Sequence, residues 1–330
     1  MANIALRSPQ YKYVVAPGGA NSAKMTITID GTLRYTIIKE KTTGNVMNFE
    51  IAELCRDYLD ILYTGVPSDT SIDITTVITT HAATDGTGTA LSTSTFTDVG
   101  FDGYGLFTEG YNPTIVSSVP RWLIDFDPDA TGLTDKYYTF APLGYEGYIP
   151  YITTGNAMAY YKFASNETTL TGTPAGIQLN IIRIDCTKYG YGHKIRFVNK
   201  YGAIQELWFF LKHTESTARK QETFQRNIVT TTGSYNADNH SITPFNTNAN
   251  QTITLSSGYY PEWTNAWFEQ LMLSEQVWLS DDSQTNPTND TVTPVTVKTS
   301  TFNKKTSVND RLIEYTFEFE LAADYINNIR

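Results

Sequence analysis

Alternation of apolar and polar side chains predicts β-strands in several short segments of the chain. In residues 25–30 the apolar residues Met25, Ile27 and Ile29 alternate with polar ones, which is typical of a strand with one buried face. Asp30-Gly31 then supplies a tight turn. Further strand candidates, SIDITTVITT, AMAYYKFAS and IQLNIIRID, follow between turn residues up to position 185. This spacing predicts a mainly β chain with antiparallel β-sandwich or barrel-like domains.

The last strand candidate shows the strictest alternation. Its apolar residues are Ile313, Tyr315, Phe317, Phe319 and Leu321. Between them stand Glu314, Thr316, Glu318 and Glu320. We therefore expect one apolar face and one face with three carboxylates.

Two segments have helical spacing and predict amphipathic helices near residues 49–63 and 261–279. The first places Ile51, Cys55 and Leu59 on one face, after Asn48 as a possible cap. The second begins at a proline, which suits the first turn of a helix, and carries three tryptophans. With these helices we divide the chain into an N-terminal β-rich domain (1–180) and a C-terminal one (181–330).

Residues 195–211, IRFVNKYGAIQELWFFL, predict a hairpin that spans 193–212. Its second half ends in five consecutive apolar residues, Leu207 to Leu211, so both faces of that strand avoid water. Two interpretations stay open, a central core strand and a subunit contact. We expect the strand in the core and the polar segment 212–230 as an interface loop. The candidate core or interface residues are Trp208, Phe209, Phe210, Trp263, Trp267, Trp278, Tyr315, Phe317 and Phe319.

Composition and charge narrow the classes of partner. The 330 residues carry a formal net charge of -10, which argues against specific nucleic-acid binding and against anionic membrane surfaces. No apolar run reaches transmembrane or signal-peptide length. The two cysteines, Cys55 and Cys186, are expected as buried free thiols, without a disulfide.

Motifs that carry chemistry are sparse. The four histidines stand apart, so we expect no catalytic residue and no cofactor. The one weak metal candidate is the loop with Asp125, Asp127 and Asp129, because alternate carboxylates can wrap a hard cation. A calcium loop of the EF-hand type needs glycine at Ala130 and glutamate at Lys136. We therefore favour a turn and no metal.

Several stretches together resemble structural proteins of short-tailed bacteriophages of gut Bacteroidales, the crAss-like group. At the N-terminus these are RSPQYKYVVAP, KMTITIDG and FEIAELCRDYLDI, and in the middle DCTKYGYGHKIRFVNKYGAIQELWFF. The tryptophan-rich helix followed by PVTVKTSTFNKKTSVNDRLIEYTFEFELAADYINNIR resembles their C-terminal ending. Residues 68–180 and 226–258 carry no such resemblance.

The resemblance implies a subunit of a neck or tail ring in the virion, assembled in the host cytoplasm. Its partners would then be further copies of itself, twelve by analogy with the portal, and neighbouring portal or tail-ring proteins. The carboxylates of 314–320 would line either the DNA channel or an outer wall, since negative walls repel phosphate. The polar segments 86–110 and 231–257 are candidate arms between subunits. The alternative is a surface glycan-binding protein, such as a phage adhesin.

Overall fold

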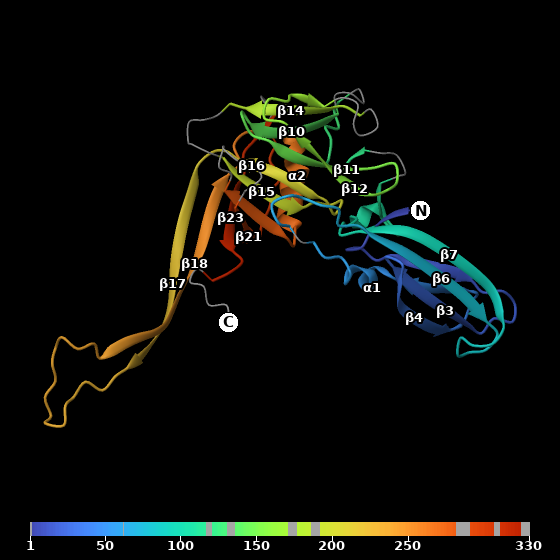
Figure 1. The fold of residues 1–330 in the computed structure, drawn as a ribbon, viewed down its shortest axis with the longest axis horizontal. Coiled ribbons are helices and arrows are strands. Elements are labelled where there is room, and N and C mark those ends of the chain that lie inside the picture. The colour runs from blue at the N-terminus through green and yellow to red at the C-terminus, as the bar shows by residue number, and fades with distance from the viewer. Residues whose placement is uncertain are drawn as a thin grey trace.

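The computed structural model describes residues 2–61, 63–116, 121–130, 136–170, 177–185, 192–281, 291–306 and 311–324. The prediction of a mainly β fold is confirmed, with 50% of residues in strands and 7% helical. Figure 1 shows an elongated molecule with an N-terminal sheet at one end, a central body and a long two-stranded hairpin at the other end.

The N-terminal sheet has six strands in the order β4-β3-β6-β7-β1-β8. Their bounds are β1 (Ala2–Ala5), β3 (Ser22–Ile29), β4 (Thr32–Glu40), β6 (Ile72–His81), β7 (Ala90–Phe101) and β8 (Thr114–Val116). One face is packed beneath a two-stranded sheet of β2 (Tyr11–Val15) and β5 (Val46–Glu50) and the helix α1 (Ala52–Arg56). Met25, Ile27 and Ile29 lie on this buried face, as their alternation predicts.

The predicted helix 49–63 is wrong in its extent, because α1 covers only Ala52–Arg56. Asn48 does not cap it, and Phe49 and Glu50 belong to β5, where they pair with Lys12 and Tyr11 of β2. Strand pairing uses the backbone groups that the first helical turn would need.

The prediction of a loop at residues 86–110 is wrong for 90–101. Residues 90–101 form β7, which pairs with β6 from Ile72↔Gly100 to His81↔Ala90. Its first eight residues are ALSTSTFT, in which small polar residues prevail, so the sequence lacks an apolar alternation. Threonine favours strands, and this property outweighs the missing hydrophobic signal.

Six short strands between residues 121 and 184 form two three-stranded sheets over the central body, in the orders β12-β11-β9 and β10-β14-β13. The strands are β9 (Arg121–Trp122), β10 (Tyr137–Pro142), β11 (Gly147–Ile152), β12 (Met158–Phe163), β13 (Thr169–Leu170) and β14 (Leu179–Ile184). Phe140 of β10 joins the core of the C-terminal half, while Trp208 of that half joins the core of these sheets. Side chains thus cross the boundary at 180/181, and the two-domain division stays a prediction.

The C-terminal sheet has seven strands in the order β16-β15-β20-β21-β23-β18-β17. Their bounds are β15 (His193–Val198), β16 (Ile204–Phe209), β17 (His213–Gln225), β18 (Ile242–Ser256), β20 (Val277–Asp281), β21 (Thr291–Val297) and β23 (Thr316–Leu321). The pairing of β15 with β16 confirms the predicted hairpin 193–212.

This sheet closes on itself like a barrel. Its two edge strands, β16 and β17, are successive parts of one bent run. At the bend, Phe210 and Leu211 donate backbone hydrogen bonds to Ser257 and Ser256, beside β18. The ring of Phe209 reaches across the interior to Phe317 and Phe319 of β23, with ring centroids 6.0 and 5.9 Å apart.

The helix α2 (Asn265–Leu273) packs into this core through Trp267, Phe268 and Leu271. It follows β19 (Tyr260–Pro261), which pairs with β22 (Leu312–Ile313), and the 3₁₀ turn η2 (Glu262–Thr264). The predicted helix 261–279 is therefore too long.

The helix ends at Leu273 because the residues that follow pair with β15 and belong to the sheet. Ser274 is extended, and its hydroxyl accepts a hydrogen bond from Val198 N and donates one to Gln276 O. Val277 and Trp278 then pair with β15 as part of β20. Trp278 consequently lies on a strand, not on a helical face.

Candidate interaction surfaces

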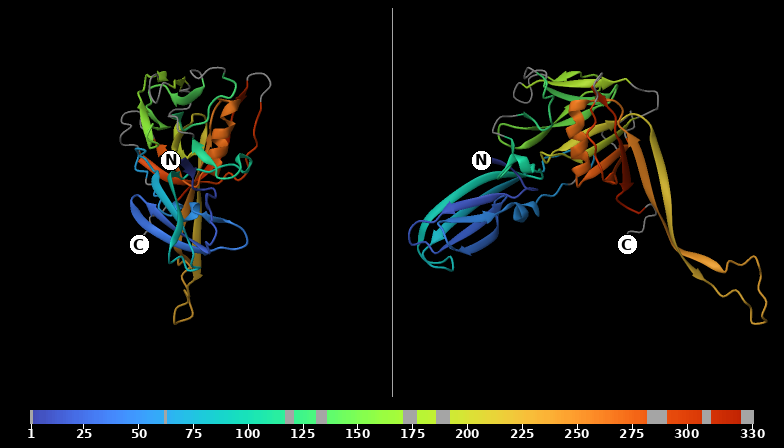
Figure 2. Two further views of the ribbon diagram at one scale, coloured as in Figure 1. Left: turned by 90° about the vertical axis from the view of Figure 1, so that its right-hand side faces the viewer. Right: turned by 180° about the vertical axis from the view of Figure 1, so that it is seen from behind.

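The most exposed element of the protein is the hairpin of β17 and β18, here called the arm (residues 213–256). Its strands pair from His213↔Leu255 to Gln225↔Ile242, with one bulge between Lys220 and Glu222. At a rise of about 3.3 Å per residue the paired part is about 43 Å long. Figures 1 and 2 show that it extends away from the body in each view. The predicted loop at 212–230 is thus wrong for 213–225, which form a strand.

The arm is anchored only at its root. Residues 252–256 of β18 also pair with β23, whereas all of β17 is exposed. The carboxylate of Glu320 accepts a hydrogen bond from Asn250 and lies 2.7 Å from the ammonium of Lys298. The bond to Lys298 is the main cause of the lowered pKa of Glu320. Beyond this root, no described residue of the body pairs with the arm's backbone.

The tip of the arm is closed by its own polar side chains. Asn227 accepts a hydrogen bond from Val229 N at 3.0 Å, and Asn236 accepts one from Asp238 N at 3.1 Å. The hydroxyl of Thr230 donates to the carbonyl of Ser234. Such short side-chain-to-backbone bonds are typical of turns. The asparagine-rich sequence of 226–241 therefore forms a defined turn region.

Apolar side chains nevertheless lie exposed along the outer half of the arm. Phe224 and Phe245 contact each other across the strands at 5.9 Å and are 47% and 48% exposed. Ile242, Val229 and Tyr235 are each more than half exposed. A two-stranded ribbon is marginally stable alone in water. Its length and its exposed apolar side chains therefore make the outer half of the arm a candidate interaction surface.

The predicted core or interface residues occupy both sides of the barrel wall. Trp208 and Phe209 are 1% exposed and point to opposite faces, Trp208 towards Tyr145 and Phe209 into the barrel. The buried members of the remaining set are Trp267, Tyr315, Phe317 and Phe319. Phe210, Trp263 and Trp278 are partly buried.

Sequence reasoning missed a group of buried charges in the hairpin of β15 and β16. Arg196 and Lys194 are 1% exposed. The guanidinium Nε of Arg196 lies 2.8 Å from Glu206 Oε1, and its Nη1 donates to Ser280 Oγ at 3.0 Å. Glu206 also accepts a hydrogen bond from Tyr148 N. The sequence could have indicated this ion pair, because the predicted hairpin places Arg196 directly opposite Glu206.

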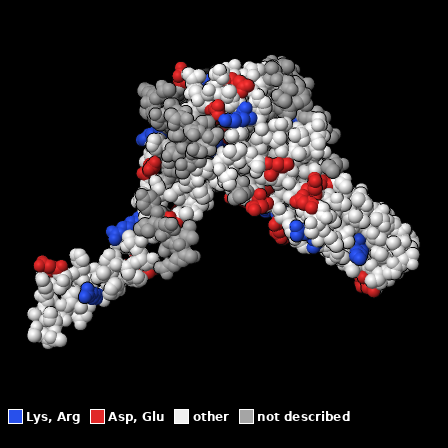
Figure 3. All heavy atoms as spheres, in the orientation of Figure 1, with Lys and Arg blue, Asp and Glu red and all other residues white. Residues whose placement is uncertain are grey.

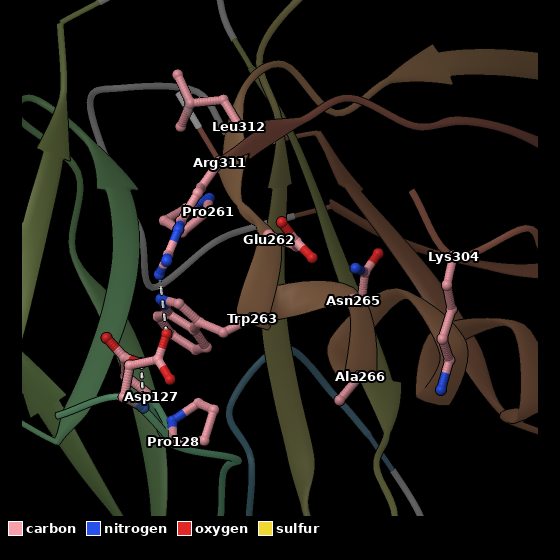
Figure 4. Close-up of a pocket in the computed structure, with 11 residues that line it drawn as sticks. Asp127, Pro128, Pro261, Glu262, Trp263, Asn265, Ala266, Lys304, Arg311 and Leu312 are labelled. Carbon is pink, nitrogen blue, oxygen red and sulfur yellow. Dashed lines mark hydrogen bonds and ion pairs between the residues drawn. The ribbon is translucent and has the colours of Figure 1, made fainter. Parts of the chain in front are cut away.

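A groove of about 840 Å³ lies beside the N-terminus of α2 (Figure 4). It is lined by Asp127, Pro128, Asp129, Pro261, Glu262, Trp263, Asn265, Ala266, Lys304, Arg311 and Leu312. Asp129 and Arg311 form an ion pair of 3.0 Å at its rim. Trp263 packs against Tyr138 and Trp267. An aromatic ring among carboxylate, amide and cationic groups suits a polar ligand such as a sugar.

The three aspartates of the acidic loop have separate protein partners. Asp125 accepts a hydrogen bond from the Tyr201 hydroxyl at 2.6 Å and another from Gln270. Asp127 accepts one from Asp129 N, as in an Asx turn. Within the described part of the chain, no group of three or more His, Cys, Asp or Glu side chains has the placement of a metal site.

Cys55 is buried, and burial raises the pKa of its thiol to about 12. It is free of disulfide bonding. Cys186 lies outside the described residues. None of the described helices is long and apolar enough to cross a membrane. Searches with the whole chain find no match among protein-family models, curated proteins or solved structures.

Proposed function

We propose that the protein is a structural subunit of a short-tailed phage virion, one of many copies in a closed ring of the neck or tail. The observation that carries the proposal is the arm, whose strand β17 is exposed at every position. Along its outer half, residues 221–246, the described residues of the body form no backbone pairing with this long ribbon. In a ring, every subunit has neighbours that cover such an element.

Charge supports the same proposal. The net charge is -10, and on the face in Figure 3 the lysines and arginines lie singly or in small groups. A channel for DNA requires walls that do not bind phosphate tightly. The carboxylate face of β23, with Glu318 exposed, is a candidate for such a wall. The copy number of twelve rests on the resemblance to ring proteins below a portal.

The proposal is tested on the purified full-length protein by light scattering after gel filtration and by electron microscopy. We expect closed rings with one rotational symmetry, with twelve copies as the proposed number. Fluorescence anisotropy with a labelled DNA duplex should show little binding at low salt, because the protein is acidic. A monomer or trimer at all concentrations, or tight binding to DNA that salt abolishes, would contradict the proposal.

A second candidate function is glycan binding, which the groove beside α2 favours. Trp263, Asn265 and Glu262 offer an aromatic surface and polar groups in one concave site. Calorimetry with a panel of oligosaccharides tests it. Saturable binding that Asp129→Ala weakens would favour this function, provided the matched exposed variant Asp60→Ala leaves it unchanged. Absence of heat with every saccharide would remove this candidate.

A further inference from the structure

The N-terminal unit carries a second exposed apolar surface, here called the stripe (Tyr11, Tyr13, Val15, Val46 and Tyr111). Three of its members, Tyr11, Tyr13 and Val15, are alternate residues of β2 and so share a face. Val46 is directly opposite Val15 on β5. Tyr111 stacks on Tyr11 with ring centroids 5.6 Å apart. The stripe therefore continues from the β2–β5 sheet onto the loop that carries η1 (Phe107–Glu109).

The stripe is as exposed as the apolar part of the arm. Tyr13, Val15, Val46 and Tyr111 are 54–64% exposed, and Phe107, in the same loop as Tyr111, is 100% exposed. The opposite face of β2 is in the core, where Val14 is buried. The stripe residues point away from the core, so formation of the core does not explain why they are apolar. A contiguous surface of this kind on a protein is typical of an interaction site.

We infer that the arm of one copy binds the stripe of the next copy, so that the subunits associate head to tail. The arm extends from one side of the central body, whereas the stripe belongs to the N-terminal unit on the other side (Figure 1), so one chain does not bring its own arm to its own stripe. In an assembly of identical copies, one kind of contact, arm on stripe, covers both apolar surfaces of every copy. Contacts between two different patches generate rings or filaments, whereas contacts between identical patches close as dimers.

The apolar part of the arm matches the stripe in length. Phe224, Ile242 and Phe245 lie within the outermost five residues of β17 and β18, and β2 and β5 are five residues long each. Five residues of a two-stranded ribbon measure about 17 Å by about 10 Å, so their contact buries about 340 Å² over both partners. The tip with Val229 and Tyr235 and the loop with Tyr111 enlarge this contact, and its repetition around a ring adds to its stability. Because the side chains proposed to make the contact are apolar, salt should not dissociate it, although Lys220, Glu222 and Arg226 flank them on the arm.

The inference rests on the proposed function only in assuming self-assembly, and complementation tests it directly. The arm variant is Phe224→Asp with Phe245→Asp, and the stripe variant is Tyr13→Asp with Val46→Asp. Each substitution replaces an exposed side chain, so circular dichroism should stay that of the wild type. The matched control is Leu33→Asp, which is 59% exposed on β4.

Light scattering should show each variant as a monomer, while the control assembles like the wild type. An equimolar mixture of the two variants should form a one-to-one pair and nothing larger, because it retains one intact arm and one intact stripe. The pair should persist when salt is raised.

Two outcomes would overturn the inference and leave the ring intact as a proposal: assembly of either variant alone, or rings of the wild type together with a mixture that stays monomeric. A wild-type protein that is monomeric, with a monomeric mixture, would contradict both the inference and the proposed ring.

Discussion

Replacing Trp208 with alanine tests whether the aromatic strand β16 belongs to the core. The indole is 1% exposed, packs edge-to-face on Tyr145 at 5.0 Å and lies 5.2 Å from the Lys194 ammonium. Truncating a buried tryptophan to alanine costs about 3 to 5 kcal/mol in unfolding free energy. With an m-value of about 3 kcal/mol/M, the urea midpoint should fall by about 1 to 1.7 M.

The assay is equilibrium unfolding in urea followed by far-ultraviolet circular dichroism, which does not depend on the lost fluorophore. Trp208→Phe is the matched control. It keeps a ring against Tyr145 and removes the indole Nε1, which has no hydrogen-bond partner among the described residues. We expect a clearly smaller loss for this variant. An unchanged midpoint for Trp208→Ala, combined with failed assembly, would refute the core assignment and place this residue in a subunit interface.

Three further predictions concern buried groups and metal. In a Cys186→Ser background, Cys55 should react with a maleimide only after unfolding, and rapid labelling of the folded protein would contradict its burial. The thiol pKa is about 8.5 in the unfolded chain and about 12 in the folded one. The free energy of unfolding should therefore fall as the pH rises from about 8.5 towards 12. Glu206→Ala should lower the free energy of unfolding in urea by about 3 to 5 kcal/mol, because it removes a buried carboxylate that lies 2.8 Å from the Arg196 guanidinium. The exposed Glu215→Ala should cost about 0.5 kcal/mol or less. Chelation of divalent cations should leave Tm unchanged in a thermal scan, and a clear decrease would reinstate the acidic loop as a metal site.

The alternation of apolar and polar residues predicted the strands that have one buried face and one solvent-exposed face. The strand of Phe317 and Phe319 and the N-terminal strand of Met25 follow their patterns, because side chains alternate between the two faces of any strand. The aromatic hairpin also matched its prediction, since five consecutive apolar residues require cover on both faces. The arm was only suggested, by a polar segment too long for an ordinary connection.

Only the tertiary structure decided the limits of both helices and the course of the polar segments. Residues 49–50 and 277–279 have apolar residues at helical spacing, yet neighbouring strands take their backbone hydrogen bonds. Pairing partners lie far away in sequence, so no local pattern reveals this competition. The same holds for β7 and β17, whose polar residues resemble loops until their partner strands are known.

Composition and alternation thus determined that the chain is mainly β, with two helices and an aromatic core. The tertiary structure decided that β16 and β17 follow each other along one bent run, that the sheet closes around Phe209, and that the remainder of the β17–β18 hairpin leaves the body as an arm. The physical reason is that a strand's own sequence specifies which of its faces is apolar, whereas closure and projection depend on which distant strands satisfy its backbone groups.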